Sequence, residues 1–298
     1  MSPQRIRGIV AATATPIDAN YTPDTARLIK HCRYLLDNGC NAINLLGTTG
    51  EATAFSTAQR LQIMRAVADA GLPMDRFMVG TGVCALEETV ALTRAACEMG
   101  FAGALVIPPF YYPDLSTDGL LAYVDLLVQR VPHPKLALYL YHIPQNTGVP
   151  WPIELVVQLK QRHPKVLVGL KDSAGDLAYA RAVAKSVADF DVFPSAEGSL
   201  ATADIDGFAG CISATTNITA PYAQAGWAAQ GTASGAASIA KASALRALLG
   251  RQSLIPSVKA ALGMVHKDPA WERLCLPLQP LAVAQQTQLI KDLTLALA

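Results

Sequence analysis

Short apolar runs alternate with longer amphipathic segments from the N-terminus to about residue 230. The short runs are aliphatic or β-branched without polar alternation, which is typical of strands buried on both faces. Eight of them are predicted strands: Gly8–Thr15, Ala42–Leu45, Arg76–Gly80, Gly103–Ile107, Leu136–Tyr141, Val166–Lys171, Asp191–Pro194 and Gly210–Ser213. Apolar residues at helical spacing predict helices between them: Pro23–Asn38, Ser56–Ala70, Leu86–Met99, Ser116–Arg130, Pro152–Arg162 and Leu177–Val187.

Regular alternation of strands and helices indicates a parallel sheet covered by helices. Eight such units favour a closed (β/α)8 TIM barrel over an open sheet, since no GxGxxG motif follows the first strand. The later residues have a helical pattern interrupted by prolines. We therefore predict a barrel over residues 1–230 and a C-terminal helical extension over 231–298, packed on the barrel as one structural unit.

The composition narrows the function classes. Of the 298 residues, 51% are hydrophobic and 16% are charged, and the formal net charge is +1. A nearly neutral chain without a concentration of basic residues argues against a nucleic-acid partner. The low charged fraction suggests that some outer surface packs against another subunit. No apolar run reaches membrane-spanning length, so we expect a soluble, cytoplasmic protein with no membrane partner.

The cysteines and histidines do not form a metal-binding pattern. The six cysteines include no CxxC pair, and the five histidines show no HExxH or HxH spacing. We interpret the cysteines as small buried side chains in a reducing compartment, and we expect no metal site.

In a barrel of this kind, catalytic residues lie where the strands end, because the βα loops gather there. The predicted strand ends carry many hydroxyl groups, one lysine and glycine-rich turns, and no arginine. Lys171 follows the apolar run Val166–Leu170, where burying an ammonium group is costly unless it is paired or neutral. A desolvated free amine would be a nucleophile. The alternative is a lysine that reaches solvent and pairs with Asp172.

Two further strand ends carry candidate chemistry. The small and hydroxyl residues of Gly47-Thr48-Thr49-Gly50 would let backbone N–H groups turn toward an anion such as a carboxylate. An ordinary turn with helix-capping threonines is the alternative. Tyr141, which ends the strand before that of Lys171, could relay protons through its phenol, or it could be a core-edge tyrosine.

Taken together, these motifs resemble those of the dihydrodipicolinate synthase / N-acetylneuraminate lyase family of class I aldolases. The matching segments are Gly47–Glu51, Tyr141–Pro144 with Thr147-Gly148, Gly169–Asp176, Pro256–Leu262 and Leu276–Leu281. They occur in order along the whole chain. The resemblance implies a (β/α)8 barrel that forms a covalent imine with pyruvate at a lysine and needs no other cofactor or metal.

The resemblance also implies a role for each matching residue. Lys171 would form the imine with the keto carbon of pyruvate, and Tyr141 would shuttle protons with a threonine beside it. Thr48 and Thr49 would bind the pyruvate carboxylate, and the backbone carbonyl of Ile212 would line the pyruvate pocket. Family members are commonly homotetramers built from two tight dimers. In these tetramers the tyrosine that matches Tyr111 reaches a neighbouring subunit's site.

The chain departs from typical dihydrodipicolinate synthases at positions that affect the substrate. Asn146 stands where those enzymes usually have an arginine for the aldehyde's carboxylate, and an amide cannot replace a bidentate guanidinium. Asn146 therefore suits a hydroxylated or uncharged partner. Ser195 replaces a frequent glycine and would narrow the pyruvate end of the pocket. Glu197 and Thr215 are candidate contacts for the distal part of a substrate, or simply solvated loop residues.

Three functions remain open. The first is an aldolase that makes or cleaves a 2-keto-3-deoxy sugar acid or a similar 4-hydroxy-2-keto acid, and the motif Lys171–Asp176 favours it. The second is a dihydrodipicolinate synthase that condenses pyruvate with aspartate semialdehyde without the usual arginine. The third is a non-catalytic sensor of keto acids, against which the intact lysine, tyrosine and threonine pair argue.

Overall fold

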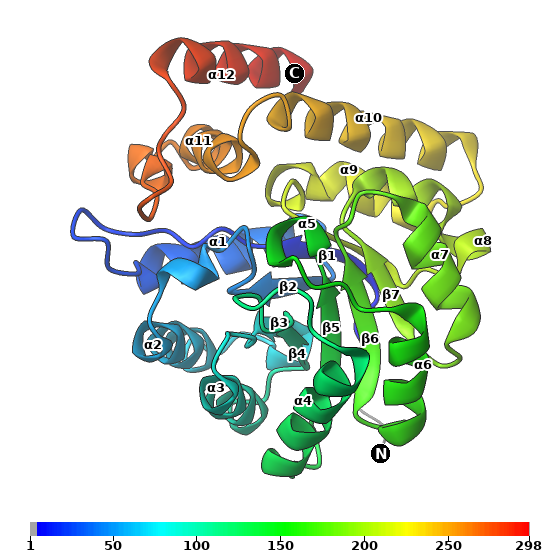
Figure 1. The fold of residues 1–298 in the computed structure, drawn as a ribbon. Helices are drawn as coiled ribbons and strands as arrows, with labels where there is room; N and C mark the ends of the chain where they lie inside the picture. The colour runs from blue at the N-terminus through cyan, green and yellow to red at the C-terminus, as the bar shows by residue number, and fades with distance from the viewer. Residues whose placement is uncertain (1–4, 298) are drawn as a thin grey trace.

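The protein is a parallel (β/α)8 barrel, as predicted. A computed structural model describes residues 5–297. Its strands pair in the order β7-β6-β5-β4-β3-β2-β1-β8, and a bridge between Val192 and Phe208 joins the two ends (Figure 1). The strands are β1 Gly8–Ala12, β2 Ala42–Leu45, β3 Phe77–Gly80, β4 Gly103–Val106, β5 Leu138–His142, β6 Leu167–Asp172, β7 Asp191–Pro194 and β8 Gly210–Ser213.

Amphipathic helices surround the strands and bury their apolar faces against them (Figure 1). Side-chain caps begin several of these helices: Asp24 caps α1, and Ser56 and Gln59 form a capping box on α2. The surrounding helices are α1 Thr25–Asp37, α2 Thr57–Ala68, α3 Leu86–Glu98, α4 Thr117–Arg130, α6 Ile153–Arg162, α7 Leu177–Ser186 and α9 Thr216–Ala228. Short helical turns lie in the loops: α5 Pro144–Thr147, α8 Ala203–Asp206, η1 Ala52–Ala54, η2 Met74–Arg76, η3 Glu197–Thr202 and η4 Pro269–Glu272.

Three further helices follow the barrel and lie together on one side of it, beyond α9 (Figure 1). They are α10 Ala233–Leu249, α11 Leu254–His266 and α12 Val283–Leu297. One cluster of buried apolar side chains joins these helices to the barrel. It contains Val258 and Leu262 of α11 together with Ala14 and Ala214. The predicted division at residue 230 falls in the connection between α9 and α10 and stays a prediction.

The barrel interior is filled by side chains and is not a pore. Met78, Leu105 and Phe193 are buried there together with Tyr139. A Cβ at Gly169 would lie 2.6 Å from the Tyr139 ring and 2.4 Å from the carbonyl oxygen of Asp191. Only glycine fits where the β6 backbone approaches its neighbours this closely. Gly169 therefore lets β6 pack tightly against the adjacent strands two residues before Lys171.

Candidate active site

Lys171 and Tyr141 lie side by side at the ends of two neighbouring strands. They are register partners in the parallel pair of β5 and β6. Lys171 Nζ lies 4.2 Å from the centroid of the Tyr141 ring. Both side chains are buried, with exposed fractions of 3% and 4%. The strand ends therefore place an amine and a phenol in one largely desolvated space.

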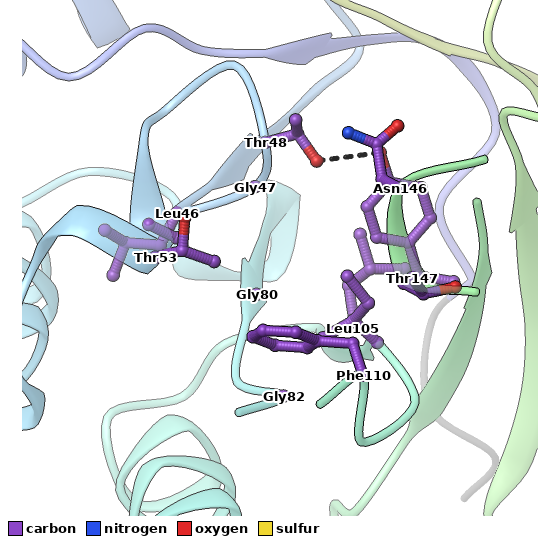
Figure 2. A pocket seen from close by; sticks show the side chains of 13 residues that line it. Leu46, Gly47, Thr48, Thr53, Gly80, Gly82, Leu105, Phe110, Asn146 and Thr147 are labelled. Atoms are coloured by element: carbon purple, nitrogen blue, oxygen red, sulfur yellow. Dashed lines mark hydrogen bonds between the residues drawn. The ribbon is translucent and has the colours of Figure 1, made fainter. Parts of the chain in front are cut away.

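Thr48 connects this pair to the loop after β2. Its Oγ1 lies 3.1 Å from the hydroxyl oxygen of Tyr141, a hydrogen bond drawn as the dashed line from Thr48 in Figure 2, and Asn146 lines the same cavity. Burial raises the pKa of Tyr141, but the charge of Lys171 and the hydrogen bond with Thr48 outweigh it and leave the pKa below its usual value. A phenol in this position releases a proton more readily than a tyrosine in water.

The loop of Thr48 is held in a tight turn. The Glu51 N–H donates to the Thr48 carbonyl at 3.0 Å, and Glu51 itself has a left-handed backbone with φ of 53°. Thr49 is 5% exposed. The turn presents the Thr48 side chain on its open side, which suits a loop that receives a small anion.

Buried contacts from the C-terminal region support the same loop. Glu51 forms an ion pair with Lys259 of α11, and neither side chain is more than 1% exposed. Glu51 Oε2 accepts from the Cys275 N–H at 2.6 Å, and Lys259 Nζ donates to the Arg273 carbonyl at 2.7 Å. Glu51 and Lys259 were not among the predicted site residues, because their meeting depends on how α11 packs.

Most predicted site residues line one cavity or its neighbour. A cavity of about 450 Å³ is bounded by residues from several strand ends, including Thr48, Thr49, Tyr141, Asn146, Lys171, Ser195 and Ile212. A smaller, mostly apolar cavity of about 240 Å³ adjoins it and is lined by Gly47 together with Thr48, Tyr141 and Asn146 (Figure 2). The structure therefore brings the predicted lysine, tyrosine and threonines together.

Two predicted site residues lie elsewhere. Tyr111 is 75% exposed on the loop after β4 and lines neither cavity. Glu197 also lines neither cavity and is fully buried. Its carboxylate accepts hydrogen bonds from Ser213, Thr215 and Thr219, so the candidate substrate contact at Glu197 and Thr215 is instead an internal polar cluster.

Arg246 is a cavity residue that the sequence prediction missed. It belongs to α10 and lines the larger cavity with Lys171, and the connection from Ser253 to Pro256 forms a further part of the wall. Arg246 lies on a helix after the last strand, whereas the predicted site residues all lie at strand ends. Nothing in the sequence around Arg246 indicates that it reaches the cavity.

No cluster of metal-ligating side chains was found in the described residues. Among residues 5–297, no three His, Cys, Asp or Glu side chains are grouped so that they could hold a metal ion. His142, which follows Tyr141, accepts a hydrogen bond from the Trp151 N–H through Nδ1, and burial lowers its pKa to about 4. None of the helices within residues 5–297 is long and apolar enough to span a bilayer.

Comparison with known proteins shows a family match along nearly the whole chain. A profile of the dihydrodipicolinate synthetase family matches residues 5–296. An uncharacterized DapA-like lyase of Chloroflexus aurantiacus is 35% identical over 279 residues, which cover 93% of this chain and 92% of the relative.

Solved structures share the fold. A dihydrodipicolinate synthase from Acinetobacter baumannii, solved with pyruvate, superimposes with a TM-score of 0.88 at 27% identity, covering 98% of this chain and 99% of that one. A 2-keto-3-deoxygluconate aldolase variant of Sulfolobus solfataricus gives a TM-score of 0.83 at 20% identity, covering 96% and 95%. At that identity the aldolase shows the fold alone.

Proposed function

Since the chain belongs to the dihydrodipicolinate synthetase family and is an enzyme of the lyase class, we propose that it is a pyruvate-dependent aldolase with Lys171 as its Schiff-base residue. The observation that carries this proposal is the position of Lys171 Nζ, buried beside the Tyr141 phenol at the cavity wall. A buried amine that opens to a cavity can attack a ketone.

The proposed reaction begins with covalent bond formation at Lys171. The amine adds to the keto carbon of pyruvate, and the resulting carbinolamine loses water to give a protonated imine. The imine withdraws electrons, so the methyl group loses a proton and an enamine forms. The enamine carbon then attacks an aldehyde carbon, the new alkoxide takes a proton, and water releases the 4-hydroxy-2-keto acid. Cleavage follows the same steps in reverse.

Tyr141 and Thr48 would move the protons. The Tyr141 hydroxyl is hydrogen-bonded to Thr48 and close to the amine, so it can protonate the departing hydroxyl group and take protons back. A phenol whose pKa lies below its usual value suits both directions of transfer.

The loop Gly47–Thr49 would bind the pyruvate carboxylate through its N–H and hydroxyl groups. Ile212 and Ser195 would line the opposite wall of the pocket. We also propose a homotetramer of two tight dimers, in which Tyr111 of one subunit reaches the site of its neighbour. Its 75% exposure in the single chain fits such a contact.

For the substrate, we propose a 2-keto-3-deoxy sugar acid or a similar 4-hydroxy-2-keto acid, because Asn146 offers an amide to a hydroxylated chain. The second candidate is the condensation of pyruvate with aspartate semialdehyde, favoured by the 27% identity with a dihydrodipicolinate synthase. Pyruvate release from 2-keto-3-deoxy acids supports the first candidate, and consumption of pyruvate with aspartate semialdehyde supports the second.

Reductive trapping tests the covalent step. Incubation with pyruvate and borohydride, followed by peptide mass mapping, is expected to add one reduced pyruvate to Lys171. Lys171→Ala is expected to remove the adduct and the activity. Lys185→Ala is the control, since Lys185 is exposed on α7. An adduct on another lysine, or turnover by Lys171→Ala, would contradict the proposal.

A further inference from the structure

A second cationic side chain reaches the cavity of Lys171 from outside the ring of strands. Arg246 extends from α10 into the lining. Among the described residues that line this cavity, Lys171 and Arg246 carry the charged groups, and none is acidic. Once Lys171 Nζ is bonded to the keto carbon as an imine, Arg246 is the cationic side chain that can still bind another part of the ligand.

The barrel holds one side of the Arg246 guanidinium in place. Its Nη1 donates to Ser213 Oγ at 3.0 Å and to Thr215 Oγ1 at 3.1 Å, and it lies 3.5 Å from Glu197 Oε2. Ser213 ends β8 and Glu197 begins η3 after β7. The orientation of the guanidinium is therefore determined by two strand ends, and not only by its own helix.

The contact with Glu197 involves only one nitrogen of Arg246 and leaves other N–H groups available for a ligand. The buried carboxylate already accepts hydroxyl hydrogen bonds from Thr215 at 2.5 Å, Thr219 at 2.6 Å and Ser213 at 3.1 Å. The Arg246 side chain is 29% exposed, and its Nε and Nη2 donate to no group within residues 5–297. An oriented guanidinium with unused N–H groups matches the two oxygens of a carboxylate.

We infer that Arg246 binds a carboxylate at the far end of the substrate, so that the aldehyde partner of pyruvate carries an acidic group. This rests on the proposed function, because it takes pyruvate to be the part bonded to Lys171. The pyruvate carboxylate is assigned to Thr48 and Thr49 after β2, whereas Arg246 is oriented from β7 and β8. One ligand can thus have an anionic group at each of these two places.

This inference changes what Asn146 implies. The absence of an arginine at that position suggested an uncharged partner, but the guanidinium comes from α10 instead. The amide of Asn146 remains available for a hydroxyl or carbonyl group in the middle of the substrate.

Matched keto acids test the inference without knowledge of the true aldehyde. Imine formation at Lys171 is measured by borohydride trapping for 2-oxoglutarate against 2-oxopentanoate, and for 2-oxoadipate against 2-oxohexanoate. The two members of a pair have equal chain length and differ in a terminal carboxylate. In at least one pair the wild type is expected to bind the acidic member roughly 10- to 100-fold more tightly, and Arg246→Met to lose that preference.

Two controls separate the explanations. Arg251→Met is the matched variant, because Arg251 is 61% exposed and pairs with Asp292 away from the cavity. Arg246→Lys, which keeps the charge but not the planar fork, is expected to retain part of the preference and also serves if Arg246→Met fails to fold. Arg251→Met is expected to keep every adduct, whereas Arg246→Met is expected to lose the adducts of the acidic keto acids to a greater extent than the pyruvate adduct.

Each outcome has a defined meaning. A wild type without preference in either pair overturns the inference. So does an equal loss of all adducts in Arg246→Met, which would make Arg246 only a counter-ion of Glu197. Stronger competition by inorganic phosphate than by succinate would reject the carboxylate in favour of phosphate. Absence of any pyruvate adduct on wild-type Lys171 would instead refute the proposed function.

Discussion

Tyr141 is the residue whose surroundings are most specific to the proposed chemistry. Its ring packs beside Lys171 Nζ and its hydroxyl meets Thr48. In the proposed reaction the ring and the hydroxyl have different purposes: the ring fills the space beside the amine, and the hydroxyl would transfer protons. Removing only the hydroxyl separates the two.

Tyr141→Phe is expected to lower kcat by about 10²- to 10⁴-fold, the usual range for loss of a general acid–base group. The fold is expected to persist, with a loss of about 1 kcal/mol in the free energy of unfolding for one hydrogen bond. Steady-state kinetics and urea unfolding measure the two effects. Tyr123→Phe is the control, because Tyr123 donates to Thr89 and does not line the cavities. Wild-type rates in Tyr141→Phe would rule out the proton shuttle.

At the scale of elements, a buried histidine joins α1 to α9 and α11. The Asn217 Nδ2 group donates to the carbonyls of Ala12 and Ala214, so its Oδ1 is the acceptor that faces His31 Nε2 at 2.9 Å. His31 Nε2 therefore carries the proton in the neutral ring. Its Nδ1 then accepts from His266 Nε2 at 3.0 Å.

This arrangement is incompatible with a charged His31. Burial lowers its pKa from 6.5 to about 3, so the folded state binds fewer protons than the unfolded state between these values. The stability from His31 is fully present above about pH 6.5 and is lost as the pH falls toward 3, at about 1.4 kcal/mol per pH unit.

His31→Gln is expected to reduce the acid sensitivity of folding. Between pH 7 and pH 5 the wild type should lose about 2 kcal/mol more unfolding free energy than the variant. Urea denaturation at both pH values measures the difference. His133→Gln is the control, since His133 lies in a surface turn and only its Nδ1 accepts, from the Lys135 N–H. An identical pH dependence in His31→Gln and wild type would show that His31 titrates normally.

At the scale of the whole molecule, the exposed loop after β4 fits the proposed association of subunits. Tyr111 and Tyr112 are 75% and 69% exposed and stack edge to face with centroids 5.2 Å apart. Two adjacent exposed tyrosines are typical of an interface, where their rings bury area at low entropic cost.

The proposed tetramer is expected to show four times the chain mass of 31.5 kDa in sedimentation equilibrium. If Tyr111 serves a neighbour's site, mixing inactive Lys171→Ala with Tyr111→Phe should restore activity. After subunit exchange in equal amounts, roughly one site in four has an intact lysine and an intact neighbouring tyrosine. Unmixed Tyr111→Phe gives the baseline. A monomeric mass, or no recovery on mixing, would contradict the shared site.

The elements of the barrel were predictable because their causes are local. Apolar runs without alternation marked the strands, and β2, β7 and β8 have the predicted bounds. The other strand limits shifted by up to three residues, as at β1, which ends at Ala12 where Thr15 was expected. Where a strand ends depends on pairing with its neighbours, which is not a local property.

Part of the site was predictable for the same reason. In a parallel barrel every strand end faces the same side, so a lysine, a tyrosine and a threonine loop at strand ends must converge. The sequence prediction missed one cavity residue that does not lie at a strand end, and it assigned to the cavity one residue whose side chain does not line it. Arg246 comes from a late helix, and Glu197 turned inward to three hydroxyl groups.

The amino-acid sequence by itself determined the alternation of strands and helices, the closed barrel and the convergence of Lys171, Tyr141 and Thr48, because periodicity and parallel pairing act over short distances. Only the tertiary structure decided which distant side chains complete the site. The Glu51 carboxylate meets the Cys275 backbone 224 positions away, and Arg246 enters the cavity through the packing of α10. Such contacts depend on how whole helices dock, and no local pattern specifies that.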